Sequence, residues 1–246
     1  YTDHNIVSRG PLLPRGTLRR VEEKTLEMNV CENIINTIRS ADPLFSRAYW
    51  RGITLRLERS IGLDVKLETG RHAPLIVMGL QFKRPIEKRY DNIHREEYYL
   101  FKINNNRAND QHIILWILSQ LAHTVFPNRF VFIGYSFPLF LYHYELASHS
   151  PNFLQRTIFI DATDFPTSKL DRLDHNVYIY GSSRTVEVES KERIEINRVY
   201  TSEELIEKLR ALKNEKLLRA SDFNKISRYH VDQVIKELKE KNVSPE

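Results

Sequence analysis

Cysteine is almost absent from this chain, since Cys31 is the only one among 246 residues. A single thiol excludes an intrachain disulfide and a zinc site built from several thiolates. This composition fits a reducing, intracellular setting, and we expect a cytoplasmic protein. Because the sequence starts at Tyr1 rather than at methionine, we expect that some N-terminal sequence has been removed or is not included.

Long apolar runs are also missing. The most apolar stretch, residues 130–141, is interrupted by Gly134 and Pro138, whereas a bilayer span needs about 18 continuous apolar residues. No secretory signal is visible at the start of the sequence. We therefore expect no membrane partner.

Glycine-rich nucleotide motifs and histidine clusters are lacking as well. None of the 8 glycines belongs to a P-loop or a dinucleotide fingerprint, which argues against ATP hydrolysis. The histidines have no spacing typical of a metal site. His143 and His149, for example, lie six positions apart and would not share a helix face.

The chain has an ordinary globular composition with a positive charge balance. Hydrophobic residues make up 41%, charged residues 28%, and the formal net charge is +5. A basic balance is compatible with a nucleic-acid partner, although many basic proteins bind none. The length allows one large hydrophobic core, or one core with an appendage.

Hydrophobic periodicity divides the chain into three regions. We expect a basic N-terminal arm (residues 1–20), an α/β domain (21–200) and a charged helical C-terminal extension (201–246). Predicted helices cover residues 21–39, 111–125, 201–213 and 229–241, and predicted strands cover 53–57, 98–103, 129–135, 157–160 and 176–180. Apart from the predicted strand at 98–103, residues 85–109 are interpreted as a long polar excursion. The order of elements predicts one mixed sheet flanked by helices.

A predicted β-hairpin over residues 58–85 carries the most informative side chains. Asp64 opens its first strand, and Gln81-Phe82-Lys83 ends its second strand. Residues two apart in a strand point to the same face, so Gln81 and Lys83 project together while Phe82 turns into the core. A carboxylate, an amide oxygen and a lysine at one strand end can hold a hard divalent cation and stabilise a phosphate.

These residues resemble the PD-(D/E)xK nuclease superfamily, which includes restriction endonucleases, Holliday-junction resolvases and phage-defence nucleases. Glu27 in Glu-Met-Asn-Val is similar to the glutamate of the first helix in the resolvases, Asp64 to the aspartate of the superfamily, and Gln81-Phe-Lys83 to its last motif. The resemblance covers roughly residues 20–135. Two positions depart from the pattern, because Leu63 replaces a proline and Gln81 replaces a carboxylate.

The resemblance implies a restriction endonuclease-like fold and a magnesium site, with Mn²⁺ as a possible substitute. Asp64 would be the main ligand, and the Gln81 side-chain oxygen and the Phe82 backbone carbonyl would complete the inner shell. A further acid would come from Glu27 or from Glu58, and the sequence does not separate these two. An amide in place of a carboxylate removes one negative charge and should weaken metal affinity.

Cationic side chains near the motif supply the remaining expected roles. Lys83 would orient or help deprotonate the attacking water and stabilise charge on the scissile phosphate. Four other basic residues, near the first strand and after the motif, are expected to contact nucleic-acid phosphates: Arg51, Arg84, Lys88 and Arg89.

Three side chains around the motif receive a structural interpretation. Glu23 and Glu32 are interpreted as solvated charges of the first helix. Gln111, at the start of a buried helix, is interpreted as a structural cap, although some relatives use a glutamine or histidine near this point to steady the site.

The resulting hypothesis is a magnesium-dependent endonuclease that hydrolyses phosphodiester bonds in DNA, with DNA favoured over RNA. By resemblance its setting would be restriction and phage defence, or DNA recombination and repair. Such enzymes often act as dimers, so a homodimer or a place in a larger complex is expected. The alternative is a catalytically inactive binding or assembly subunit that keeps the nuclease fold.

Overall fold

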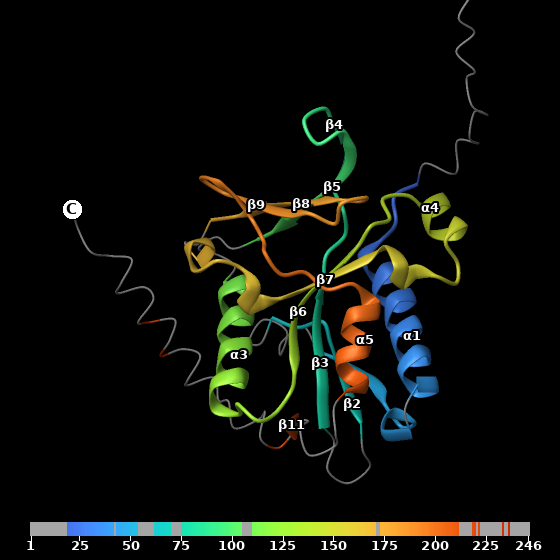
Figure 1. Ribbon diagram of the computed structural model, residues 1–246, viewed down its shortest axis with the longest axis vertical. Coiled ribbons are helices and arrows are strands. Elements are labelled where there is room, and N and C mark those ends of the chain that lie inside the picture. The colour runs from blue at the N-terminus through green and yellow to red at the C-terminus, as the bar shows by residue number, and fades with distance from the viewer. Residues whose placement is uncertain are drawn as a thin grey trace, which may run out of the picture.

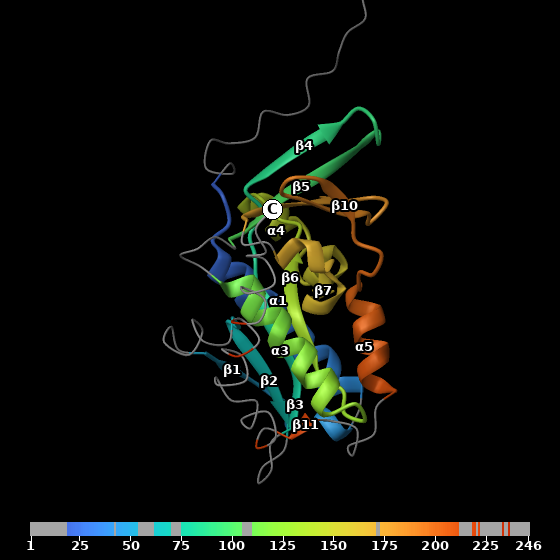
Figure 2. The same ribbon diagram turned by 90° about the vertical axis from the view of Figure 1, so that its left-hand side faces the viewer.

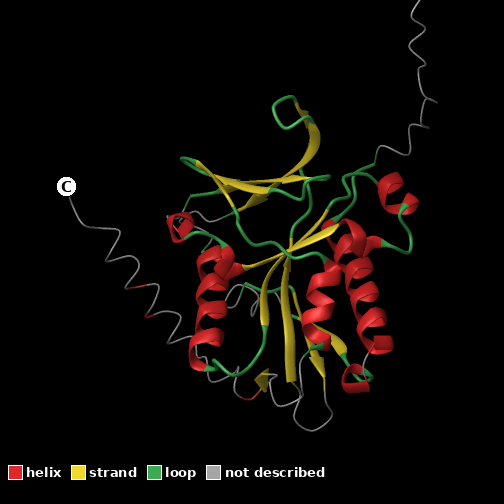
Figure 3. Ribbon diagram, in the orientation of Figure 1, coloured by secondary structure: helices red, strands yellow, loops and turns green. Residues whose placement is uncertain are grey.

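The computed structural model describes residues 19–41, 43–53, 62–69, 75–104, 110–170 and 173–211, together with positions 218, 219, 221, 233 and 236. Two β-sheets and a set of helices make up this part of the chain (Figures 1 and 3). The predicted mixed α/β class is confirmed. The expectation of a single sheet is wrong, because a second, fully antiparallel sheet lies beside the mixed one.

The main sheet is mixed, with strand order β1-β2-β3-β6-β7. Its strands are β1 (Tyr49–Gly52), β2 (Val65–Thr69), β3 (Leu75–Phe82), β6 (Phe132–Pro138) and β7 (Thr157–Asp161), and β11 (Leu218–Arg219) pairs with β3. Only the β3–β6 pair among these is parallel. A parallel pair needs a crossover connection, and α3 (Gln111–Val125) lies on that connection.

Helices cover both faces of the main sheet. In Figure 1, α3 lies on one side of the strands, while α1 (Glu23–Ala41) and α5 (Ser202–Arg210) lie on the other. Apolar residues recur along α1 at helical spacing and are buried, as Leu26, Val30 and Ile34 illustrate. The shorter helices are α4 (His143–Ser148) and the 3₁₀ helices η2 (Pro43–Phe45), η3 (Phe153–Arg156), η4 (Ala162–Asp164) and η5 (Thr167–Leu170).

The second sheet has the order β10-β9-β8-β5-β4. It consists of β4 (Glu87–Asp91), β5 (Glu96–Ile103), β8 (His175–Tyr180), β9 (Val186–Glu189) and β10 (Arg193–Glu195). Figure 2 shows β4 and β5 as a hairpin that extends beyond the other strands. Residues 87–91 were expected to be an irregular excursion, because their sequence Glu-Lys-Arg-Tyr-Asp has no apolar alternation.

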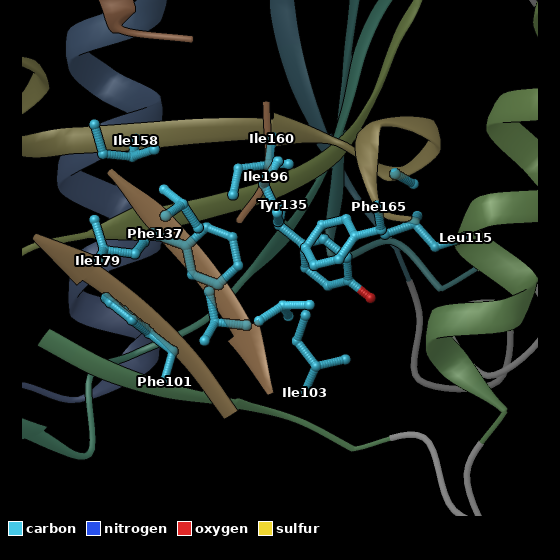
Figure 4. Close-up of a cluster of buried hydrophobic side chains, with 14 of the residues drawn as sticks. Phe101, Ile103, Leu115, Tyr135, Phe137, Ile158, Ile160, Phe165, Ile179 and Ile196 are labelled. Atoms are coloured by element: carbon cyan, nitrogen blue, oxygen red, sulfur yellow. The ribbon is translucent and has the colours of Figure 1, made fainter. Parts of the chain in front are cut away.

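The main core fills the space between the two sheets and α3. Phe101 and Ile179 of the second sheet meet Tyr135 and Phe137 of β6 and Leu115 of α3 in this cluster (Figure 4). A second cluster packs α1 and α5 on the opposite face of the main sheet. Fully burying one such side chain stabilises the fold by about 1.5–3 kcal/mol, so the two clusters hold both sheets and the helices together.

A buried carboxylate ties the second sheet to the connection after β6. Glu145 of α4 accepts hydrogen bonds from the backbone nitrogens of Leu141 (2.6 Å) and Tyr142 (3.1 Å). It also accepts from Nζ of Lys88 on β4 (3.3 Å) and from the hydroxyl of Tyr99 on β5 (3.4 Å). These contacts fix the base of the β4–β5 hairpin.

Two of the predicted helices match the structure closely. The helix expected at 111–125 is confirmed, and the one expected at 21–39 is observed at Glu23–Ala41. A strand was expected at 53–57, but residue 53 does not belong to a strand, and β1 ends just before it at Gly52. Residues 54–61 lie outside the described part. The expected helix at 229–241 and the arm up to residue 18 also lie outside the described part, apart from positions 233 and 236.

α5 begins the region that was expected to be a charged extension. A capping box at Thr201 and Glu204 starts this helix. Its side chains Leu205 and Leu209 are buried in the cluster shared with α1. None of the described helices combines the length and the apolar character that a bilayer span needs.

Candidate active site at the end of strand β3

The site lies where β2 begins and β3 ends. These strands are antiparallel, and Val65 pairs with Leu80. Asp64, just before β2, therefore lies beside Gln81 and Phe82, and its backbone nitrogen donates to the Leu80 carbonyl (2.9 Å). The hairpin register alone thus brings the predicted acid to the predicted Gln-x-Lys segment.

The carboxylate of Asp64 is held by groups from β3. The backbone nitrogen of Phe82 donates to Oδ2 of Asp64 at 2.7 Å. Nε2 of Gln81 donates to Oδ1 and Oδ2 of Asp64 at 3.1 and 3.0 Å, and lies 3.4 Å from the Phe82 carbonyl oxygen. Three oxygen atoms therefore surround one amide nitrogen.

A second glutamine continues this network toward the lysine. Nε2 of Gln111, the first residue of α3, donates to Oε1 of Gln81 (2.7 Å). Nζ of Lys83 donates to Oε1 of Gln111 (3.3 Å). The interpretation of Gln111 as a structural cap is therefore corrected, because its side chain contacts two residues of the site.

The two charged ends of this network determine how both amides are oriented. A lysine ammonium only donates hydrogen bonds and a carboxylate only accepts them. Gln111 must therefore present its oxygen to Lys83 and its nitrogen to Gln81. Gln81 in turn must present its nitrogen to Asp64. We call this chain of Lys83, Gln111, Gln81 and Asp64 the polar relay.

Acidic residues of α1 border the relay. Glu27 is buried and forms an ion pair with Lys24. Oε2 of Glu23 accepts a hydrogen bond from the backbone nitrogen of Arg84 (3.2 Å). Burial raises the pKa of Glu23 above its ordinary value, although the positive charge of Lys83 opposes this shift. Glu23 is thus a partly buried neighbour of Lys83 rather than the solvated helix charge that we expected.

Two buried aromatic side chains, Tyr135 and His112, lie next to the relay. Tyr135 of β6 pairs with Gln81 in the sheet register, and its hydroxyl lies 2.9 Å from Nδ1 of His112. Burial, then the charges of His175 and Lys83, lower the pKa of His112 to about 3. Burial also raises the pKa of Tyr135, to which the negative charge of Asp64 contributes. Both rings are therefore uncharged at neutral pH.

The four basic residues expected to contact phosphates do not gather at one place. Arg84 follows Lys83 directly and lies 3.7 Å from Glu22. Arg51 of β1 lies 3.9 Å from Glu68. The other two are on β4, where Lys88 pairs with Glu97 (2.9 Å) and Glu145 (3.3 Å), and Arg89 pairs with Glu87 (2.6 Å). Glu58, the other candidate acid, lies outside the described residues.

No family model, curated protein or solved structure matches this chain.

The oxygens at the relay are the kind that hard divalent cations prefer. The Asp64 carboxylate and the Phe82 carbonyl face one point, where the amino group of Gln81 now lies. Rotation of the Gln81 amide by half a turn would bring its own oxygen to this point, at the cost of the contact with Gln111. Within the described residues, no group of three or more His, Cys, Asp or Glu side chains could hold a metal, so amide and backbone oxygens are needed here.

Sequence reasoning missed two members of the site, Glu23 and Gln111. Glu23 is 61 positions from Arg84, and Gln111 is 30 positions from Gln81. Neither pair leaves a local signal, because tertiary packing of α1 and α3 on the sheet creates both contacts. The one available hint came from the resemblance, since some relatives use a glutamine or histidine near this point to steady the site.

Proposed function

We propose that this protein is a metal-dependent nuclease that hydrolyses phosphodiester bonds in DNA. The observation that supports it is the convergence of Asp64, Gln81, the Phe82 carbonyl and Lys83 at the end of β3. These residue types occur in the order that the resemblance to PD-(D/E)xK nucleases requires. The observed mixed α/β fold is consistent with that class.

Asp64, the Phe82 carbonyl and, after rotation of its amide, the Gln81 side-chain oxygen would hold the cation. A bound Mg²⁺ lowers the pKa of a water molecule and neutralises charge on a phosphate. Glu27 is the acid of α1 that the resemblance assigns to the site, and Lys24 now forms an ion pair with it. Lys24 also acts electrostatically on Asp64, so this lysine balances carboxylate charge at the site.

Lys83 is suited to act on the phosphate and on the attacking water. Its ammonium is held by Gln111 at 3.3 Å, and its backbone nitrogen is fixed by the Ser136 carbonyl at 3.0 Å. A preorganised cation stabilises the charge that develops in a transition state without reorganising itself. Arg84, whose side chain is 43% exposed, can contact a neighbouring phosphate of the same strand.

A second candidate function is a binding or assembly protein that keeps this fold without catalysis. It is favoured by the position of the Gln81 amino group, which donates to the oxygens that a cation would need. In this reading the relay replaces the metal by an internal hydrogen-bond donor. Metal dependence separates the two candidates, because a scaffold should bind nucleic acid equally well in EDTA.

The test is cleavage of supercoiled plasmid and linear DNA with Mg²⁺, with Mn²⁺ and with EDTA. The proposal predicts metal-dependent cleavage that Asp64→Ala and Lys83→Ala each reduce by at least about 100-fold. Matched controls are Lys102→Ala and Asp174→Ala, which break an ion pair of the second sheet (3.0 Å) and should retain full activity.

Two outcomes contradict this proposal. No cleavage in either metal, combined with DNA binding that EDTA does not change, supports the scaffold. Cleavage that survives both Asp64→Ala and Lys83→Ala places the chemistry elsewhere in the chain.

A further inference from the structure

A separate cavity of about 250 Å³ opens between α3, the start of β6, the end of β7 and α5. Its polar lining includes His123, Asp161, Asp164, Arg198, Tyr200 and Lys208. His123 lies 12 positions after Gln111 on the same helix, which corresponds to about 18 Å. The cavity is therefore distinct from the site at the end of β3.

Two cations lie close to one aromatic ring in this cavity. The Arg198 guanidinium lies 5.1 Å from the ring centre of Tyr200, and Nζ of Lys208 lies 4.5 Å from it. Lys208 also donates to the Tyr200 hydroxyl (3.3 Å). Among the described residues, neither Arg198 nor Lys208 has a carboxylate within ion-pairing distance. Burial, then the charge of Arg198, lowers the pKa of Lys208, although the negative charges of Asp164, Asp161 and Glu204 oppose this shift.

The two carboxylates of the cavity, Asp161 and Asp164, differ in the hydrogen bonds that they accept. Asp161 accepts hydrogen bonds from Ser119 (2.8 Å) and from the nitrogen and hydroxyl of Thr163 (3.0 and 2.7 Å). Burial would raise the pKa of Asp161, but the His123 imidazole, whose Nε2 lies 3.7 Å from Oδ2, and the hydrogen bonds from Thr163 outweigh it and lower the pKa. Oδ2 of Asp164, by contrast, is buried and has no hydrogen-bond partner among the described residues.

Among its described residues, the cavity therefore holds two cations that no carboxylate pairs with at ion-pairing distance, and one buried carboxylate oxygen without a hydrogen-bond donor. We propose that it binds a phosphate ester with free hydroxyl groups, such as a mononucleotide or a sugar phosphate. The phosphate would lie at Arg198 and Lys208, and a hydroxyl would donate to Asp164. Two neighbouring cations match the charge of a phosphate ester, close to −2 at neutral pH, better than that of a single carboxylate.

The cavity walls supply apolar contact as well. Phe130, Val131 and Leu205 line it beside Tyr200, and aromatic rings are favourable surfaces for stacking a base. A mononucleotide would use these walls, whereas a sugar phosphate would not. This inference uses none of the residues of the polar relay and holds whether or not the nuclease proposal is correct.

The test is isothermal titration of the full chain with adenosine and uridine 5′-monophosphates, ribose 5-phosphate and inorganic phosphate. The phosphate esters should bind more tightly than inorganic phosphate, and a further gain for the nucleotides identifies stacking on the apolar walls. Arg198→Ala and Lys208→Met should each weaken ester binding by about 10-fold or more, the factor expected for one charge-assisted hydrogen bond. Asp164→Asn should weaken binding of the esters but not of inorganic phosphate.

Arg210→Met provides the matched control, because Arg210 is an exposed cation on the same helix as Lys208. Its affinities should equal those of the unchanged chain, and circular dichroism melts verify that every variant is folded. Failure of all four probes to bind would overturn the proposal. Binding that Arg198→Ala and Lys208→Met leave unchanged would overturn it equally, as would inorganic phosphate binding as tightly as the esters.

Discussion

The amino group of Gln81 lies 3.0 and 3.1 Å from the two carboxylate oxygens of Asp64. A hydrogen-bond donor thus lies where the proposed nuclease activity needs a cation. Lys83, through Gln111, keeps the Gln81 amide in this orientation. The strength of this internal contact, set against the affinity for a metal, decides whether the site is catalytic or purely structural.

Replacing Gln81 by glutamate should make the fold depend on metal. In Gln81→Glu a second carboxylate faces Asp64 and the donor is lost, so we expect the free energy of unfolding in EDTA to fall by about 1–3 kcal/mol. Millimolar Mg²⁺ should restore stability, because a ligand that binds only the native state stabilises it. Thermal unfolding with and without Mg²⁺ measures both effects.

The control for this variant is Gln155→Glu, which introduces the same charge at an exposed position. Its melting temperature should be nearly unchanged in either condition. A Gln81→Glu protein as stable in EDTA as the original, and unresponsive to Mg²⁺, would contradict the proposed metal position.

Glu145→Ala should destabilise the protein by about 3–5 kcal/mol. The substitution leaves Lys88 without its buried partner and the Leu141 and Tyr142 nitrogens without an acceptor. Urea unfolding measures the loss, with Glu32→Ala on the exposed side of α1 as a control expected to change stability by less than about 0.5 kcal/mol. Equal midpoints for the two variants would show that this carboxylate does not stabilise the link between the second sheet and the connection after β6.

Gly134→Ala should be poorly tolerated because β6 and β7 approach closely at this residue. An added Cβ would lie 2.1 Å from the Ile160 carbonyl oxygen and 2.9 Å from Cα of Asp161. The strands must move apart, at a cost of about 3 kcal/mol. Gly52→Ala, where nothing lies within 4 Å of the added Cβ, should leave the melting temperature almost unchanged. Two similar melting temperatures would mean that the strands can separate freely.

Asp164→Asn should stabilise the protein in a pH-dependent way. Burial, then the charge of Asp161, raises the pKa of Asp164 to about 6 from its ordinary value of 3.8. The native state therefore binds this proton more tightly than the unfolded state does. The free energy of unfolding falls as pH rises from about 4 to 6, and the loss persists at higher pH.

Asparagine removes this loss. We expect the free energy of unfolding of Asp164→Asn to exceed that of the original protein by about 1 kcal/mol at pH 7.5, after allowance for solvent screening of a half-exposed group. At pH 4 the two free energies of unfolding should be equal. Urea unfolding of both proteins at the two pH values measures these free energies. The same difference between the proteins at both values would mean that Asp164 does not titrate as described.

Local pattern was sufficient for much of the fold. The helix at Gln111–Val125 was predictable because it is a long, mostly apolar segment that follows the polar residue Asp110. Asp64, Gln81 and Lys83 could be expected to converge, because a hairpin register and a two-residue period determine where strand side chains point.

Contacts between distant elements could not be predicted in the same way. β4 pairs with β5 through backbone hydrogen bonds, and its polar side chains gave no periodic signal. Gln111 and Glu23 join the site only because α3 and α1 pack beside β3. The residues that decide the orientation of Gln81 are therefore set by tertiary structure.

The most direct test of the proposed function is a Mn²⁺ titration of the purified chain, with free Mn²⁺ measured by electron paramagnetic resonance. The nuclease proposal predicts Mn²⁺ binding that Asp64→Ala weakens by at least about 10-fold, because the main ligand is lost, while Asp174→Ala leaves it unchanged. Absence of binding by the original chain, or equal binding by Asp64→Ala, would contradict the claim that the end of β3 is a metal site.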